Sequence, residues 1–333
     1  MSKLVVSLSP HAHGNDSVEK NMYGVVIALL PALLVSCYFF GIGSAIVCLV
    51  SVAACLFFEW AICKAFLKRQ PTLHDGSAIV TGLLLGMNLP SNFPIWMIIV
   101  GALVAIGVAK MTFGGLGQNP FNPALVGRCF LLVSFPTAMT SWPVVGQWTS
   151  YTDATTGATP LAVMKEAIKS GDASVLDKLP SAMDMLLGNT SNGMGAGTIG
   201  EVCAIALLVG LAYMLWKKII TWHIPVSILA TVFVIAGLMH AVNPIYANPV
   251  QVLLSGGLML GAIFMATDYV TSPMNHRGQF IYGVAIGVLT IVIRNWGAYP
   301  EGMSFAILIM NAFTPLINMY VKPKRFGEVP AKK

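Results

Sequence analysis

Charged residues are scarce in this sequence. Asp, Glu, Lys and Arg make up 10% of the 333 residues and hydrophobic types 56%, whereas roughly a quarter of an ordinary soluble domain is charged. A water-soluble fold cannot hide that much apolar surface, so the composition excludes a soluble globular protein. Charge is missing altogether from five stretches, which run over residues 21–58, 76–109, 129–152, 219–267 and 302–321.

Cysteine is also sparse, with six residues and no C-x-x-C spacing. No histidine cluster lies nearby, and the pair His11 and His13 has too few neighbouring ligands for a metal site. We therefore expect no metal centre, cluster or disulfide framework held by this chain alone. Packing within apolar runs is the expected role of the cysteines, which are Cys37, Cys48, Cys55, Cys63, Cys129 and Cys203.

Long apolar runs dominate what is present. A membrane-spanning helix needs about 20 mostly apolar residues, and helices span because lipid offers no partner for open backbone groups. We expect an all-α integral membrane protein, and no cleavable signal peptide, since the first apolar run is long enough to remain as an anchor. About ten spans are predicted, at residues 21–40, 43–66, 75–90, 94–113, 121–140, 199–216, 219–241, 248–267, 279–296 and 301–320.

The basic residues predict the orientation of these spans in the inner (plasma) membrane. If the N-terminus is cytoplasmic, all but five of the 19 Lys and Arg residues fall on the cytoplasmic side, as the positive-inside rule requires. The N-terminal segment 1–20 and the basic tail 322–333 are then cytoplasmic. This grouping of charge reflects topology rather than a nucleic-acid surface, so membrane lipid is an expected partner and nucleic acid is not.

A polar loop at residues 141–198 divides the chain into two halves, 21–140 and 199–321, with five predicted spans each. Because the number per half is odd, similar halves would lie in opposite orientations, as inverted repeats do. A few short sequence matches between the two halves agree with an internal repeat, all at an offset of about 183 residues. In one of them Lys110 and Arg294 each end a predicted span. On this topology the loop faces the outside.

The segment 113–124 is rich in glycine, proline and asparagine, so a regular helix cannot continue through it. Irregular backbone near a membrane is tolerated where it faces a cavity. The segment therefore either lines a binding site with its amide side chains or forms a surface turn between two helices. It is not a dinucleotide-binding fingerprint, because no strand precedes it.

Thr159 in the central loop is predicted to begin a helix. Threonine is a good N-cap, Pro160 suits the first helical position, and Leu161, Met164 and Ile168 have the spacing of an amphipathic helix. A phosphate ester on the Thr159 hydroxyl would lie at the positive end of this helix, beside unpaired amide hydrogens. An ordinary structural cap is the alternative.

Residues 153–159 favour the phosphate ester over an ordinary structural cap. Their sequence, DATTGAT, resembles the flavinylation motif D-x-x-[S/T]-G-A-T that a bacterial FMN transferase modifies, and all five specified positions agree: Asp153, Thr156, Gly157, Ala158 and Thr159. Average residue usage would produce such a match by accident in roughly one chain of this length in a few thousand. The resemblance implies FMN joined to Thr159 by a phosphoester, and the transferase as a maturation partner.

The rest of the chain resembles the D subunits of the Rnf electron-transport complex and the related B subunits of the sodium-translocating NADH:quinone reductase. The compact start favours the Rnf type, and the quinone-reductase type is the alternative. The residues that carry the resemblance are 9–11, 22–32, 75–78, 114–124, 266–273, 293–302 and 311–316.

The resemblance implies a function within an assembly. The complex would oxidise ferredoxin, reduce NAD and move sodium ions or protons, with the A, B, C, E and G subunits as partners. This chain would be inactive alone and supply no catalytic side chain, because the flavin performs the redox chemistry. Asn119 and Asn122 are candidate contacts to a noncovalent riboflavin. A urea-channel-like solute transporter is the alternative from another class, since inverted halves with broken segments also suit a pore.

Five polar residues lie within or beside predicted spans, where charge is costly and is often functional. Most are near span ends, so snorkelling to the membrane surface or a contact with a helix end is the simpler interpretation. These residues are Glu59, Lys110, His240, Asp268 and Arg294.

Overall fold

The computed structural model describes residues 17–68, 70–189, 193–299 and 301–322. Residues 9–11, Pro300 and all but the first residue of the predicted basic tail lie outside the described residues, as does most of the N-terminal segment 1–20. Within the described ranges the chain is helical and contains no strand, and two isolated β-bridges are its only β pairing. The all-α prediction is confirmed.

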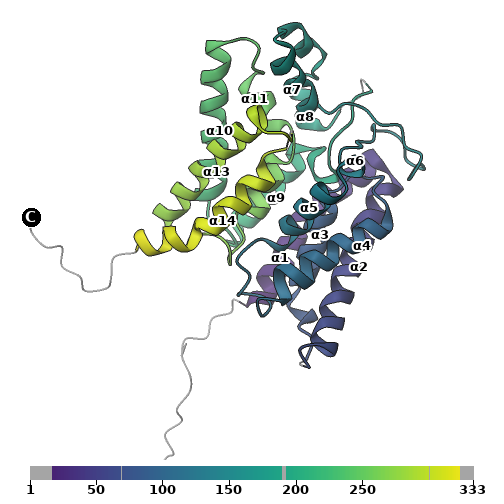
Figure 1. Ribbon diagram of the computed structural model, residues 1–333, viewed down its shortest axis with the longest axis vertical. Helices are drawn as coiled ribbons and strands as arrows, with labels where there is room; N and C mark the ends of the chain where they lie inside the picture. Colours follow the sequence, from purple (N-terminus) through teal and green to yellow (C-terminus); the bar gives the residue numbers. More distant parts are fainter. Residues whose placement is uncertain (1–16, 69, 190–192, 300, 323–333) are drawn as a thin grey trace, which may run out of the picture.

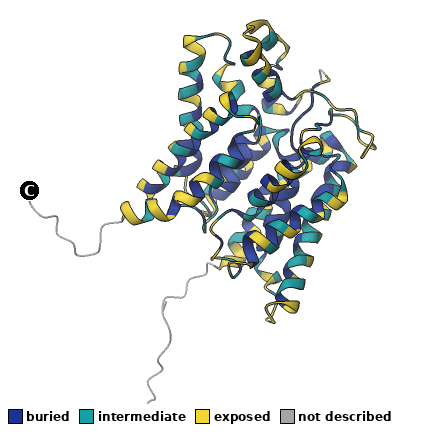
Figure 2. Cartoon of the chain, viewed as in Figure 1, coloured by how far each residue is buried: buried dark blue, intermediate teal, exposed yellow. Residues whose placement is uncertain are grey.

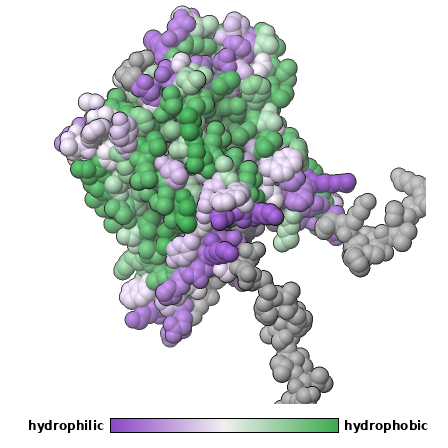
Figure 3. Space-filling view, turned by 180° about the vertical axis from the view of Figure 1, so that it is seen from behind, coloured by the Kyte–Doolittle hydropathy of each residue, from purple (hydrophilic) through white to green (hydrophobic). Residues whose placement is uncertain are grey.

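Five helices are long and apolar enough to cross a membrane, and each coincides with a predicted span. Their surfaces carry many exposed large hydrophobic side chains, and Figure 3 shows the resulting hydrophobic band between hydrophilic ends. The five helices are α1 (Val18–Phe40), α2 (Ile42–Ala65), α10 (His223–Val242), α13 (His276–Trp296) and α14 (Met303–Tyr320).

The other predicted spans are shorter or interrupted, so a count of ten full-length spans is not confirmed. The run 248–267 is the most broken, because Gly256 adopts a φ of +65° that ends its first helix. The shorter elements are α3 (Ser77–Met87), α4 (Ile95–Leu103) with the π-helix η2 (Val104–Met111), α5 (Pro123–Ser134), α6 (Pro136–Met139), α9 (Ala204–Trp216), α11 (Pro249–Leu254), α12 (Leu258–Leu260) and the π-helix η5 (Gly261–Met265).

The helices pack as two groups, one from each half of the chain, and the two groups contact each other. In the first half α2 packs against α3 and α4, and in the second half α10 packs against α13 and α11. Across the halves, α1 contacts α9 and α5 contacts α14. Buried side chains gather between these elements, where one apolar core runs through both groups (Figure 2).

The central loop covers one end of the bundle. Its helices are α7 (Pro160–Ser170), η3 (Ala173–Lys178) and α8 (Ala182–Leu187), followed by η4 (Ile199–Glu201). Figure 1 shows α7 and α8 at the end opposite the starts of α1 and α13 and the end of α14, while the short η1 (Leu73–Asp75) precedes α3. All six cysteines lie in the described ranges, and four of them are buried.

Candidate functional site

Thr159 is the N-cap of α7, as predicted. Its Oγ1 accepts a hydrogen bond from the backbone N–H of Ala162 at 3.2 Å, and Pro160 occupies the first helical position. The side chain is 7% exposed, and the helix buries Leu161 and Met164 against the second half. The helix start therefore fixes both the position and the direction of the Thr159 hydroxyl.

The backbone before Thr159 is held between two neighbouring segments. The Gly157 N–H donates to the Trp142 carbonyl at 2.9 Å, and the Gly195 N–H donates to the Ala158 carbonyl at 3.1 Å. A Cβ on Gly157 would lie 2.6 Å from the Gly193 carbonyl oxygen. The motif thus needs glycine at position 157 for close backbone packing, a reason that its sequence does not reveal.

The other specified motif positions have different surroundings. Asp153, Thr156 and Ala158 are exposed, and Thr156 forms a backbone bridge with Pro143. Of the specified positions only Thr159 is buried, and Gly157 is partly buried. The exposed positions are the ones that a modifying enzyme could contact directly.

The Thr159 side chain lines a small cavity together with Trp142, Glu201, Gly256 and Glu301. Two buried arginines lie behind this lining. Arg128 from α5 contacts Ser304 and pairs with Glu301.

Arg294 from α13 supplies the second positive charge. It donates to the backbone carbonyls of Val252 at 2.9 Å and Ser255 at 2.8 Å. The two guanidinium groups balance the carboxylates of Glu201 and Glu301, so the cavity does not repel an anion through uncompensated negative charge. A phosphate ester on Thr159 fits here, because it would meet the amide end of α7.

One side chain ties α7 to the second half. The Lys165 ammonium donates to the carbonyl oxygens of Gly297 at 2.7 Å and Ala298 at 3.0 Å, at the end of α13. Burial, and the neighbouring charge of Lys169, lower the pKa of Lys165 below its ordinary value. The middle of the loop helix is therefore fixed to the end of a membrane helix.

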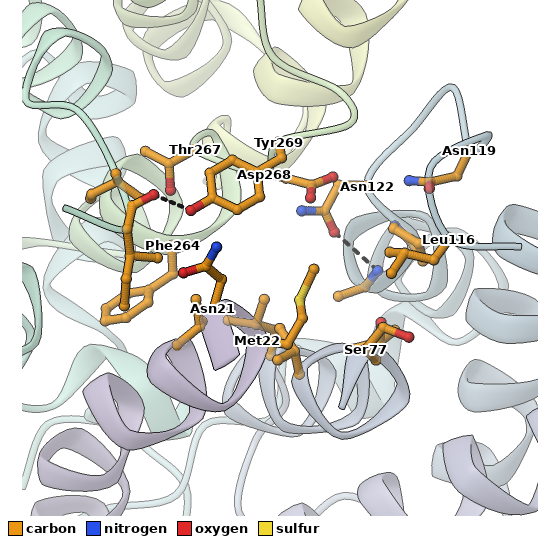
Figure 4. Close-up of a pocket in the computed structure, with 18 of the residues that line it drawn as sticks. Asn21, Met22, Ser77, Leu116, Asn119, Asn122, Phe264, Thr267, Asp268 and Tyr269 are labelled. Atoms are coloured by element: carbon orange, nitrogen blue, oxygen red, sulfur yellow. Dashed lines mark hydrogen bonds between the residues drawn. The ribbon is translucent and has the colours of Figure 1, made fainter. Parts of the chain in front are cut away.

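A second cavity lies between the two halves at the other end of α1 (Figure 4). The asparagines of the segment 113–124 face it: Asn122 caps α5 by accepting from the Ala124 N–H at 3.1 Å, and its amide donates to the Met265 carbonyl at 3.2 Å. Asn119 is also buried and donates to the Phe121 carbonyl at 3.0 Å.

The two alternatives for the segment 113–124 therefore apply to different parts of it. Gly117 and Gln118 are exposed, as in a surface turn, whereas the two asparagines line the cavity. Sequence reasoning did not assign Asn21 and Thr267 to a site, although both line this cavity. Asn21 belongs to no motif, and Thr267 enters only as part of the resembling segment 266–273.

Three of the five polar residues do not snorkel, although one of the three, Arg294, makes the predicted contact with a helix end, that of α11. Glu59, Lys110 and Arg294 are buried, and the Lys110 Nζ lies 2.7 Å from Glu59 Oε2. Asp268 lines the inter-half cavity, where it accepts from the Thr271 hydroxyl at 3.1 Å.

His240, the fifth residue, is exposed near the end of α10, where its ring contacts the Tyr246 carbonyl. It lines neither cavity.

These features define a class: a multi-pass, all-helical membrane protein with an enclosed hydroxyl at a loop-helix start and a polar cavity between its halves. The sequence model of the NQR2, RnfD, RnfE family matches residues 5–327, and the chain belongs to this family.

Named relatives are similar to this chain over nearly their whole length. It is 43% identical to the D subunit of the Na⁺-translocating ferredoxin:NAD⁺ oxidoreductase complex of Acetobacterium woodii, over 99% of this chain and 97% of that protein. It is 41% identical to the D subunit of the proton-translocating ferredoxin:NAD⁺ oxidoreductase complex of Clostridium ljungdahlii, over 97% and 96%. The D subunit of the ion-translocating oxidoreductase complex of Yersinia pseudotuberculosis is 38% identical, over 98% and 99%.

Proposed function

We propose that this chain is the membrane flavoprotein subunit of an Rnf-type ion-translocating ferredoxin:NAD oxidoreductase, with FMN joined to the Thr159 hydroxyl by a phosphoester. The observation that carries the proposal is the complete motif at residues 153–159, which ends at the N-cap of α7. FMN, when bound, supplies the redox chemistry. The chain contributes a helix start that favours the phosphate and a cavity beside it.

Two sets of contacts around Thr159 would hold an attached flavin in place. The hydrogen-bonded backbone around Gly157 and Ala158 fixes the attachment point, and the Lys165 contact fixes α7 against α13. Together they would hold the flavin at one distance from the membrane helices. A constant distance suits electron transfer to and from the other subunits of the complex.

For orientation, we infer that the termini are cytoplasmic, that the protein lies in the inner membrane and that the Thr159 loop faces outside. The distribution of Lys and Arg supports this. Inverted halves are supported by the odd number of predicted spans in each half. Electrons from cytoplasmic ferredoxin would then cross the membrane to this flavin and return, which offers a basis for coupling to ion movement.

A noncovalent riboflavin is the second cofactor that we propose, in the inter-half cavity. Asn119 and Asn122 line it together with Ser77, Thr267 and Asp268 (Figure 4). Carbonyl and hydroxyl groups of a flavin can pair with such amides and hydroxyls. The two flavins would then lie near opposite ends of the helix bundle.

The coupling ion is sodium or a proton. Relatives at 43% and 41% identity are named for different ions, so overall similarity does not separate them. The expected partners are the A, B, C, E and G subunits of the complex and the FMN transferase.

Detection of a covalently bound flavin tests the proposal and separates it from a solute transporter. The purified chain on a denaturing gel should fluoresce yellow-green under ultraviolet light if flavin is covalently bound. A dark band from cells that contain the transferase would contradict the electron-transfer function and leave the transporter.

A further inference from the structure

Lys110 is the only cationic residue among the described residues that line the inter-half cavity. It lies near the end of the π-helix η2 and is 2% exposed, so its ammonium is almost fully withdrawn from water. A buried ammonium is costly unless its charge and its hydrogens are satisfied. The surroundings of this group therefore indicate what the cavity is built to hold.

Two of the three ammonium hydrogens have partners. The Nζ donates to Glu59 Oε2 at 2.7 Å and to the Ser77 Oγ at 2.6 Å. An ammonium carries three donors, and no third acceptor is present among the described residues. Because Lys110 lines the cavity and Glu59 does not, the remaining donor is available to an acceptor within the cavity.

The cavity has a second charged group, the carboxylate of Asp268. Asp268 and Asn122 come from different halves and lie near each other in Figure 4, with Ser77 on the opposite side of the cavity. A ligand that fits this arrangement has an acceptor edge for Lys110 and hydroxyl donors for Asp268. An isoalloxazine ring with a hydroxylated side chain has both.

We propose that Lys110 binds the N1–C2 carbonyl edge of the noncovalent flavin and thereby favours its reduced state. This inference rests on the second-flavin part of the proposed function. Two-electron reduction at neutral pH places negative charge on that edge, and a nearby ammonium stabilises it in a site shielded from water. Glu59 positions Lys110 and partly offsets its charge.

The test uses the full-length chain with Thr159→Asn, which removes the covalent flavin signal. Riboflavin is the probe, and its affinity is measured in the oxidised form and after reduction with dithionite. The measured quantity is the ratio of the reduced to the oxidised affinity. Glu59→Gln should raise this ratio, because Lys110 keeps its charge and loses its counter-charge.

The double variant Glu59→Gln/Lys110→Met should lower the ratio roughly tenfold, the effect of one lost hydrogen bond from a charged donor. The double variant avoids leaving Glu59 buried without a partner. Lys217→Met is the matched control, since Lys217 is exposed and stacks on Trp216. It should leave the ratio unchanged.

Two outcomes would contradict the inference. If riboflavin binds and the ratio is the same in all variants, the role of Lys110 is wrong and the second flavin stands. If the folded Thr159→Asn chain binds no riboflavin, the inference and the second flavin both fail, while FMN on Thr159 is unaffected.

Discussion

The Nζ of Lys110 lies 2.7 Å from Oε2 of Glu59, although the two residues are 51 positions apart in the sequence. The pair joins η2 to α2, and both side chains are buried. Buried ion pairs add little net stability compared with apolar packing, yet losing one partner leaves an uncompensated charge. Single and double substitutions of the pair should therefore differ in their effect on the free energy of unfolding.

Lys110→Met alone should lower the free energy of unfolding by about 3–5 kcal/mol, because Glu59 loses its counter-charge. The double variant Glu59→Gln/Lys110→Met should recover most of that loss. Thermal unfolding of the detergent-solubilised protein measures both. Equal losses in the single and double variants would contradict a direct pairing.

Gly157→Ala should destabilise the loop by about 1–3 kcal/mol, since the new Cβ would lie 2.6 Å from the Gly193 carbonyl oxygen. Displacement of Thr159 should also reduce flavin attachment, by roughly tenfold or more. Ala154→Ser, at an unspecified motif position, is the control for flavin yield. Normal yield and stability in Gly157→Ala would show that the backbone packing is not required.

Asn122→Ser keeps a side-chain oxygen to cap α5 but loses the amide that donates to the Met265 carbonyl. Stability should fall by about 1 kcal/mol. The affinity for riboflavin should fall roughly tenfold if the amide also contacts the flavin. Equilibrium dialysis checks the affinity, and an affinity equal to that of the unchanged protein would remove Asn122 from the site.

The orientation has its own test. Lys169→Cys lies on the exposed side of α7, and Lys217→Cys follows α9 at the opposite end. A membrane-impermeant thiol reagent added to intact cells should label the first variant and spare the second, above the background of the native cysteines. The reverse pattern would place the Thr159 loop in the cytoplasm.

Local sequence signals predicted the parts of the structure that depend on neighbouring residues. Thr159 followed by Pro160 marked the start of α7, because capping involves only the first turn. Apolar runs likewise located the five long helices.

Non-local features could not be predicted in this way. The break at Gly256 falls within an apolar run that suits a continuous helix, and the partner of Lys110 lies on another helix. Position near a predicted span end suggested snorkelling for Lys110, whereas packing of α2, α3 and η2 encloses it.

The central claim concerns one covalent bond, and the mass of one peptide tests it most directly. Trypsin should release residues 129–165 as a single peptide, since no Lys or Arg lies between Arg128 and Lys165. Thr159→Asn is the matched variant, because asparagine also caps a helix and cannot form the ester.

The account predicts that this peptide from the native protein is heavier by FMN less one water, with the added mass on Thr159. The Thr159→Asn peptide should be unmodified in a protein of nearly unchanged thermal stability. An unmodified native peptide from cells that contain the transferase, or an FMN adduct that persists in Thr159→Asn, would contradict the account.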